Sequence, residues 1–352
     1  MVGAYGFDKD GTPDIPDVGA TYLIHGPISG DISLDQADAI FVGEGEEDYS
    51  GWSTVGGADF TGDGSADDIL IGAYNADEGG LNGPGVVYLM QGPHSGEIDI
   101  SLAPARFIGE SNFDYAGYDI DFADVNGDGI DDAIIGAYGH DGGGNASGGA
   151  YVVQGPFSGD IDLYYAEGKY KGEGSFHFAG QSISNAGDFN GDGLDDIIVG
   201  ATGEDSLATQ AGAAYVLFGP AETVATEDIG TANVKFVGHN GFSYAGWSVA
   251  PCADINGDGA SDLIIGAPED DTAGTKAGAA YVAFGPEYGT ISLQNTYAKW
   301  VGAGADHSAG AALACGDINN DGLSDILVGA PGENSSGAET GAAFLVLGAT
   351  GW

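Results

Sequence analysis

The sequence predicts an all-β fold, a β-propeller of four-stranded antiparallel blades. The chain has 352 residues, 66 of them glycine, and it repeats itself at intervals of 63 to 66 residues. Each full period holds four short segments of β-branched and aromatic residues, bounded by Gly, Pro and Asp, which is typical of strands rather than helices. Four short strands repeated radially describe a propeller, whereas a β-solenoid has shorter repeats.

The period is marked by an Asp-rich loop whose first residue falls at 59, 124, 188, 254 and 317. A period this regular leaves no room for a separate catalytic domain. Residues 1–352 are therefore predicted to form a single propeller domain.

Each repeat contains the segments A, B, C and D in the same order, here taken from the fourth. Segment A has an aromatic and a small-residue pattern, as in Tyr244-Ala-Gly-Trp-Ser248, and the Asp loop follows it. Segment B is Leu263-Ile-Ile-Gly-Ala-Pro268, and an acidic, Gly-rich loop leads from there to segment C. Segment D ends in an aromatic and a glycine, as in Trp300-Val-Gly302.

The two ends of the chain cut through repeats. It opens inside a segment B, at Val2–Tyr5, and closes after a sixth segment C, Gly341–Gly348. The count is five segments A, five Asp loops, six segments C and five segments D, which gives about six blades. Either six imperfect blades close a ring, or the chain is a fragment of a larger, seven-bladed propeller, and the start in mid-repeat favours the second interpretation.

Antiparallel strands sort the loops onto two faces. The A-to-B loops with the Asp pattern share one face with the C-to-D loops, and the D-to-A and B-to-C loops share the other. We call these the Asp-loop face and the opposite face.

The Asp loop reads D-x-N-x-D-G-x-x-D in its fullest form, Asp254–Asp262. Oxygen side chains at positions 1, 3, 5 and 9, with a glycine at position 6 for a sharp turn, suit a hard cation. Calcium takes about six to eight oxygen ligands, whereas Mg²⁺ demands a tighter octahedron and retains its waters. The alternative is an unmetallated Asx turn, since Asp, Asn and Gly are common turn formers. Three carboxylates held this close favour a counter-ion.

Together with the apolar-Gly-Ala-Pro segment after it and the aromatic-Gly segment before it, this loop resembles the FG-GAP repeat of integrin alpha-chain propellers. It is also similar to bacterial proteins with integrin-alpha-like repeats, and the resemblance covers essentially the whole chain. It implies about five structural Ca²⁺ sites. Because no Glu stands at position 12 and no helical pattern flanks the loops, these are not EF-hands.

The implied side-chain ligands stand at positions 1, 3, 5 and 9 of each loop, and position 7 contributes its backbone carbonyl. The first loop departs at position 3, where a threonine hydroxyl replaces the amide, so we expect the weakest site there. The implied residues are Asp59, Thr61, Asp63, Ser65 and Asp67; Asp124, Asn126, Asp128, Ile130 and Asp132; Asp188, Asn190, Asp192, Leu194 and Asp196; Asp254, Asn256, Asp258, Ala260 and Asp262; and Asp317, Asn319, Asp321, Leu323 and Asp325.

The composition excludes several classes of partner. Fifty-four acidic residues face seven Lys plus Arg, for a formal charge of −47. Such a surface repels nucleic acids and anionic membranes. No apolar run reaches the roughly 18 residues of a membrane span, and no signal peptide is visible at the start. The acidity and the implied calcium sites predict an extracellular or cell-surface protein.

Catalysis has little support in the sequence. The six histidines fall at different repeat positions, and no G-x-S-x-G, H-E-x-x-H or C-x-x-C pattern is present. We therefore predict no catalytic residue and no enzyme. Cys252 and Cys315 occupy one repeat position in neighbouring repeats, which is compatible with a disulfide, but buried free thiols are the favoured interpretation.

The leading hypothesis is a calcium-binding propeller that acts in cell adhesion or protein recognition. A protein or cell-surface ligand would bind the opposite face, where acidic loops and the aromatics Phe113 and Phe242 are expected at the surface. The alternatives are a non-catalytic module of a secreted hydrolase and a purely structural or engineered repeat scaffold. The sequence leaves the oligomeric state open.

Overall fold

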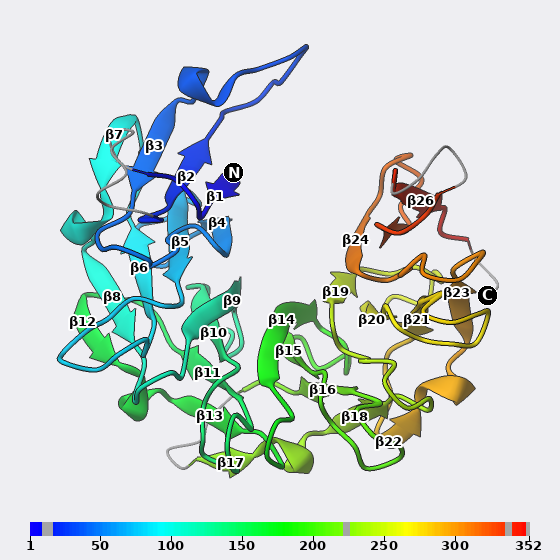
Figure 1. Ribbon diagram of the computed structural model, residues 1–352. Helices are drawn as coiled ribbons and strands as arrows, with labels where there is room; N and C mark the ends of the chain where they lie inside the picture. Colours follow the sequence, from blue (N-terminus) through cyan, green and yellow to red (C-terminus); the bar gives the residue numbers. More distant parts are fainter. Residues whose placement is uncertain (9–16, 221–225, 335–339, 350–352) are drawn as a thin grey trace.

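The computed structural model describes residues 1–8, 17–220, 226–334 and 340–349, and these residues form the predicted all-β propeller. Six sheets follow one another along an arc, one per blade (Figure 1). Blades 1 and 6 stand at the two ends of this arc, and no strand of one pairs with a strand of the other among the described residues. The six blades do not close a ring in this structure.

Each inner blade contains strands from segments A to D in antiparallel order, with segment A nearest the arc's centre. As predicted, the described residues give blade 1 no inner strand and blade 6 no outer strand. Blade 1 has β1 (Val2–Ala4), β2 (Ala20–Leu23) and β3 (Ala39–Val42); blade 2 has β4 (Thr54–Ala58), β5 (Asp68–Ala73), β6 (Val86–Met90) and β8 (Ala105–Ile108); blade 3 has β9 (Ala116–Ala123), β10 (Asp132–Ala137), β11 (Gly149–Val153) and β13 (Gly168–Lys171). Blade 4 has β14 (Ala179–Gly187), β15 (Asp196–Ala201), β16 (Ala213–Leu217) and β18 (Val234–Val237); blade 5 has β19 (Val249–Cys252), β20 (Asp262–Ala267), β21 (Ala279–Ala283) and β23 (Ala298–Val301); blade 6 has β24 (Ala312–Gly316), β25 (Asp325–Ala330) and β26 (Ala342–Val346).

The sequence did not predict an added outer strand in the first four blades, which is the fourth strand of blade 1 and the fifth of blades 2 to 4. After segment C the chain crosses to the preceding blade and pairs in parallel with its outer strand before returning through a 3-10 turn. These added strands are β7 (Gly96–Asp99), β12 (Gly159–Asp162), β17 (Glu227–Asp228) and β22 (Gly289–Ser292). The 3-10 turns are η2 (Leu34–Gln36), η3 (Ile100–Leu102), η4 (Leu163–Tyr165), η5 (Ile229–Thr231) and η6 (Leu293–Asn295).

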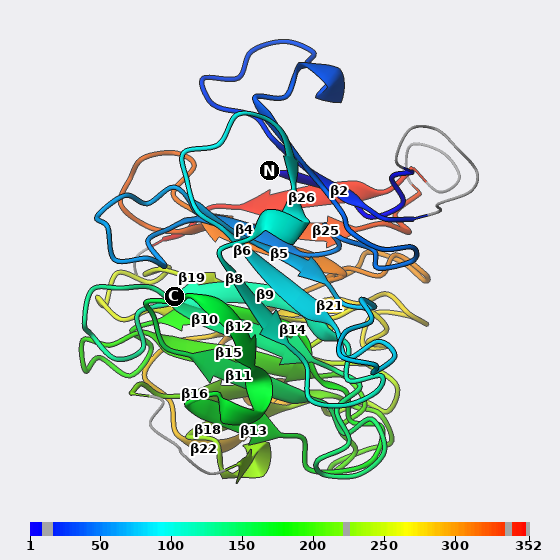
Figure 2. The ribbon, with the colours of Figure 1, turned by 90° about the vertical axis from the view of Figure 1, so that its left-hand side faces the viewer.

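The loops divide between two faces as predicted. In Figure 2 the strands run across the middle of the molecule and the loops gather at its two sides. Hydrogen bonds from backbone N–H groups to Asp carboxylates join each Asp loop to a C-to-D turn, as from Gly219 N to Asp196 Oδ1. Backbone hydrogen bonds join B-to-C loops to D-to-A loops, as from Phe113 to Asn82.

Five hydrophobic cores hold the blades together, and each is shared by two consecutive blades. Segments B and C are buried along their whole length in blades 2 to 5, because both sheet faces meet a neighbouring blade. The last blade has one neighbour only, and Phe344 and Leu345 of β26 are exposed. Burial by neighbours therefore supplies most of the apolar stabilisation.

Glycines make the blades approach most closely. The glycine of segment B lies against the glycine carbonyl of segment A in the next blade, so that a Cβ on the first would come under 3.0 Å from that oxygen. The pairs are Gly3 with Gly51, Gly72 with Gly117, Gly136 with Gly180, Gly200 with Gly246 and Gly266 with Gly310. A backbone oxygen cannot rotate away as a side chain can, so only glycine fits the first position.

Polar side chains add a second inter-blade contact at the inner strands. Ser53, Asp119 and Ser182, which share one repeat position, each accept the backbone N–H of the next blade's inner strand. Asp119 accepts from Ile183 at 2.9 Å and from the Ser53 hydroxyl at 3.2 Å. Burial raises the pKa of Asp119 to about 7, against the hydrogen bonds that lower it.

The cysteines correct a sequence expectation. Cys252 of β19 and Cys315 of β24 form a disulfide, with their Cα atoms 5.1 Å apart, so the favoured interpretation of free thiols was wrong. Inner strands of neighbouring blades are close enough at this repeat position for a bond to form. Disulfides persist in oxidising compartments.

We predict that Gly200→Ala destabilises the protein by about 3 kcal/mol or more, because the new methyl group collides with the Gly246 carbonyl. Gly329→Ala is the matched control: it is the equivalent glycine of blade 6, where a Cβ would lie 3.3 Å from the nearest atom. Urea unfolding midpoints measure both. Equal shifts for the two variants would contradict the blade-contact argument.

We predict that Asp119→Ser stabilises the protein above neutral pH and not near pH 4. In the unfolded chain the Asp119 carboxyl has a pKa of about 3.9, so it loses its proton at a lower pH than in the folded protein. The contribution of Asp119 to the free energy of unfolding therefore falls as pH rises from about 4 to 7. Serine keeps the acceptor that Ser182 supplies in blade 4. The stability difference between variant and wild type should grow by about 2 kcal/mol between pH 4 and 8, since solvent reaches part of this side chain.

Chemical unfolding across that pH range measures the difference, in which contributions from unchanged carboxylates cancel. Asp31→Ser, at an exposed position, is the control and should show no such growth. A flat difference for Asp119→Ser would show that its charge is not penalised in the folded state.

Candidate metal loops and the opposite aromatic face

The first Asp of each loop organises the turn. In the third loop the Asp188 carboxylate accepts the backbone N–H of Gly191, Asp192 and Gly193 at 2.7, 2.9 and 3.0 Å. The first, second and fourth loops repeat the three bonds, and the fifth has the last two. The residue at position 7 donates its N–H to the Asp at position 5 in all five loops.

A fully buried Asp at the start of each segment B ties the loop to the blade. Asp196 accepts the N–H of Phe189 inside the loop and that of Gly219 in the C-to-D turn, both at 3.0 Å. The same two bonds recur in every blade that has an Asp loop. The five buried residues are Asp68, Asp132, Asp196, Asp262 and Asp325.

This pattern shifts the sequence alignment of the first loop by one residue. Asp68, rather than the predicted Asp67, occupies the buried place. From its first Asp to the buried Asp this loop has one residue more than the other four, and Ala58 still pairs with Asp68 as Ala123 pairs with Asp132 in blade 3. The pair Asp67-Asp68 concealed the insertion, because either residue satisfies the pattern.

The remaining loop side chains converge. Asn190 Nδ2 lies 3.0 Å from an Asp192 oxygen and 3.4 Å from an Asp196 oxygen, so positions 3, 5 and 9 meet. Burial, together with the charge of Asp192, raises the pKa of Asp196 to about 7. A cation among these oxygens would relieve both effects, and the all-oxygen donor set fits calcium.

In the described part of the chain, no three or more His, Cys, Asp or Glu side chains form a group that could hold a metal ion. The converging groups in each loop include an amide or hydroxyl besides carboxylates. Calcium ligation by the residues named above, Thr61 and the position 7 carbonyls included, therefore stays a prediction.

The opposite face carries an aromatic strip that the sequence analysis missed. It consists of Tyr5, Tyr49, Trp52, Tyr74, Tyr115, Tyr118, Tyr138 and Phe178, whose rings contact one another in an unbroken series over blades 1 to 4. Tyr49 stacks on Tyr74, and Tyr115 on Tyr138, with centroids 5.6 and 5.2 Å apart. The sequence does contain this pattern: in the repeats of blades 2 and 3, the first and fourth residues of segment A and the residue ending segment B are all aromatic.

Phe113 and Phe242 are exposed on the same face, as predicted, at 54% and 53%. Beneath the loops, four of the seven basic residues share one position in segment D: Arg106, Lys169, Lys235 and Lys299. Lys235 lies 2.7 Å from Glu173 and 3.0 Å from the fully buried Glu204. Arg106 pairs with Glu78 and Asp160, and Lys169 with Glu110, so three of these four cations neutralise carboxylates.

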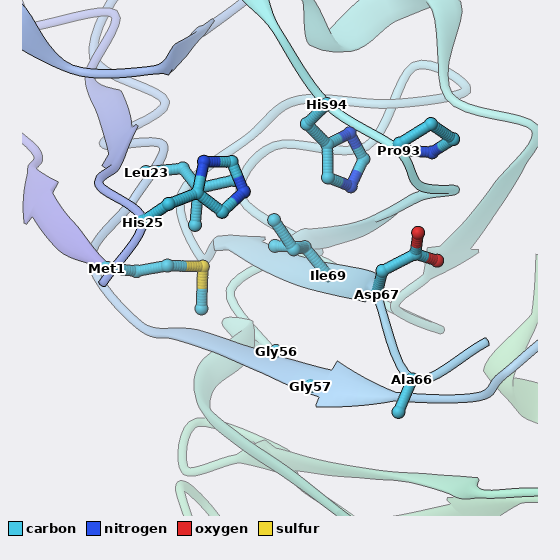
Figure 3. Close-up of a pocket in the computed structure, with 10 residues that line it drawn as sticks. All are labelled: Met1, Leu23, His25, Gly56, Gly57, Ala66, Asp67, Ile69, Pro93 and His94. Atoms are coloured by element: carbon cyan, nitrogen blue, oxygen red, sulfur yellow. The ribbon is translucent and has the colours of Figure 1, made fainter. Parts of the chain in front are cut away.

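A hollow of about 410 Å³ lies beside the end of the first Asp loop (Figure 3). His25 and His94, from neighbouring blades, both line it, although the sequence placed the histidines at unrelated positions. His94 is buried, its Nε2 has no hydrogen-bond partner, and burial lowers its pKa. His25 lies 3.2 Å from the Asp38 carboxylate.

Comparisons with known proteins agree with this architecture. The model of the FG-GAP repeat family matches residues 50–90, 179–217, 245–283 and 309–346. These spans hold the strands from segments A to C of blades 2, 4, 5 and 6. Blade 3 has the same strand order and the same loop hydrogen bonds.

Several curated relatives match part of the chain. Integrin alpha pat-2 of Caenorhabditis elegans is 32% identical over 167 residues, which are 43% of this chain and 13% of the relative. Phosphatidylinositol-glycan-specific phospholipase D of Bos taurus is 30% identical over 166 residues, 44% of this chain and 19% of the relative. The enzyme of the same name from Dictyostelium discoideum is 30% identical over 172 residues, 44% and 18%.

The fold and the loops thus define a repeat-built β-propeller with Asp-rich turns on one face. The chain is an integrin-alpha-like FG-GAP repeat protein. The matched region covers less than a fifth of each of these relatives. Within the described residues, none of the helical segments has the length and apolarity to cross a membrane.

Proposed function

We propose that this chain is a calcium-stabilised propeller that acts outside the cell, or at its surface, in adhesion or protein recognition. The observation that carries the calcium part is the fivefold recurrence of one loop hydrogen-bond pattern, in which buried and exposed carboxylates lie close together and no Lys or Arg of the described residues pairs with them. A bound ion would fix the A-to-B turn against the C-to-D turn and hold each blade in shape. The role is structural, and the proposal assigns no catalytic residue.

The recognition part rests on the opposite face and on the relatives. An integrin alpha chain shares the repeats, and the opposite face presents aromatic side chains on a rigid scaffold. Exposed aromatic patches of this kind mark interaction sites. The disulfide between β19 and β24 supports an oxidising, extracellular setting.

A second candidate is a non-catalytic module that accompanies a hydrolase. The matches to phosphatidylinositol-glycan-specific phospholipases D favour this second candidate, since the similarity covers the repeat region. Both candidates use the propeller for recognition. They differ in whether a catalytic partner is joined to it.

We predict that calcium raises the melting temperature and that a chelator lowers it, because the ions bind the folded loops in preference to the unfolded chain. Saturation at one hundred times the dissociation constant adds about 2.7 kcal/mol per site. Elemental analysis after gel filtration should find about five ions per chain, one for each Asp loop. Asp192→Asn should remove one of them, while Asp35→Asn, in the exposed turn η2, should remove none.

An unchanged melting temperature on chelation, with no ion retained, would refute calcium binding. The same measurement with Mg²⁺ tests selectivity. We expect the smaller ion to stabilise less, and Thr61→Asn to strengthen the first site.

We predict that beads coated with the protein bind cells or matrix proteins through the opposite face. Phe113→Ser combined with Phe242→Ser should reduce binding at least several-fold, because both side chains are exposed there. Leu102→Ser with Tyr165→Ser is the matched control, since these exposed side chains lie in the turns η3 and η4 by the outer strands. Equal losses in both double variants would argue against a specific face.

A further inference from the structure

The aromatic strip of the opposite face is interrupted by a polar stretch in blade 4. The fourth residue of segment A is Trp52 in blade 2 and Tyr118 in blade 3, but Gln181 in blade 4. The residue that ends segment B changes in the same way, from Tyr74 and Tyr138 to Thr202. Aromatic residues return in blade 5.

A hollow of about 440 Å³ lies at this interruption. Tyr138 of blade 3 and Phe178 of blade 4 line it, with ring centroids 6.4 Å apart. Tyr244 and Trp247 line it from blade 5, and Trp247 is 45% exposed. The polar residues of blade 4 therefore lie between two groups of aromatic side chains, in a volume typical of small-ligand sites.

The polar groups of the hollow are oriented by hydroxyls. Thr202 Oγ1 donates to Gln181 Oε1 at 2.6 Å, and the Tyr244 hydroxyl donates to Gln210 Oε1 at 3.3 Å. Each carboxamide oxygen is thus held by a neighbour. Within the described residues, neither Nε2 has a hydrogen-bond acceptor, so both amide groups keep donors for a ligand.

The backbone does not demand aromatics here. Phe178 and Tyr244 have φ of 57° and 53°, in the left-handed region, but Ser308 at the same position of blade 6 has 53° as well. The conformation belongs to the repeat, and serine meets it equally. The aromatic side chains therefore have to be explained by what they contact.

The charge of the hollow favours a neutral ligand. Its carboxylate, Glu269, already pairs with Lys276 at 2.9 Å, so a cation finds it neutralised. The net charge of −47 opposes an anion. A purely apolar ligand would leave the amide donors without partners, which costs free energy.

We propose that this hollow binds a neutral saccharide. A pyranose ring offers C–H groups to the electron-rich faces of Trp247 and Tyr244. Its hydroxyls both accept and donate, which matches the free Nε2 donors of Gln181 and Gln210 and the second lone pair of each carboxamide oxygen. A proline-rich peptide also uses aromatic grooves, but its carbonyls only accept. The inference rests on the proposed recognition role and names the chemical class of the ligand.

The test is an array of neutral, sialylated and sulfated glycans, followed by tryptophan-fluorescence titration of the full chain at constant calcium. We expect neutral glycans to bind. Trp247→Ala and Gln181→Ala should each weaken binding at least tenfold, and Trp247→Phe should retain part of it, with melting curves checking the fold. Tyr165→Ala, at an exposed aromatic side chain of the turn η4 away from this face, is the control and should change affinity less than twofold.

Binding of anionic glycans alone, or of a proline-rich peptide alone, would overturn the proposal, as would equal losses from Trp247→Ala and Tyr165→Ala. If the bead assay finds cell or matrix binding but no glycan binds, the saccharide site is refuted and the recognition role stands. If neither assay finds a ligand, both fail.

Discussion

The contact on which the rest of this propeller depends is the approach of two glycine backbones between neighbouring blades. A segment B glycine lies directly against a segment A carbonyl of the next blade in all five blade-to-blade contacts. This approach brings the inner strands close enough for Ser53, Asp119 and Ser182 to accept backbone N–H groups across the interface. The shared hydrophobic cores fill the wider space outside it.

Electrostatics is arranged around the same frame. An acidic chain of this size repels itself, and four of its seven basic residues share one position in segment D. Arg106, Lys169 and Lys235 neutralise carboxylates there, such as the fully buried Glu204. The Asp loops have no such cation. Their carboxylates are satisfied by backbone N–H groups, which shape the turns but leave the negative charges close together.

The sequence repeat was enough to predict most of the architecture. Strand order, the two loop faces and the incomplete end blades follow from a repeat, because every copy confirms the others. What a repeat hides is a local difference between copies. The extra residue before Asp68 was invisible because Asp67 fits the same pattern, and the Cys252–Cys315 bond depends on a distance between two blades that no single repeat contains. The aromatic strip was missed for a related reason: its members alternate between segments A and B, and only the fold makes them neighbours.

Because the parallel strands β7, β12, β17 and β22 each pair with the preceding blade, the boundaries of a sequence repeat and of a structural blade do not coincide. Each blade from 1 to 4 borrows its outermost strand from the repeat that follows. Removing one repeat would therefore damage two blades, and a single blade cut out along its own boundaries would carry an open edge. A fragment in which every sheet keeps its outermost strand is therefore longer than one sequence repeat. Adding or removing a blade changes the connecting strand to the neighbouring blade as well as the blade itself.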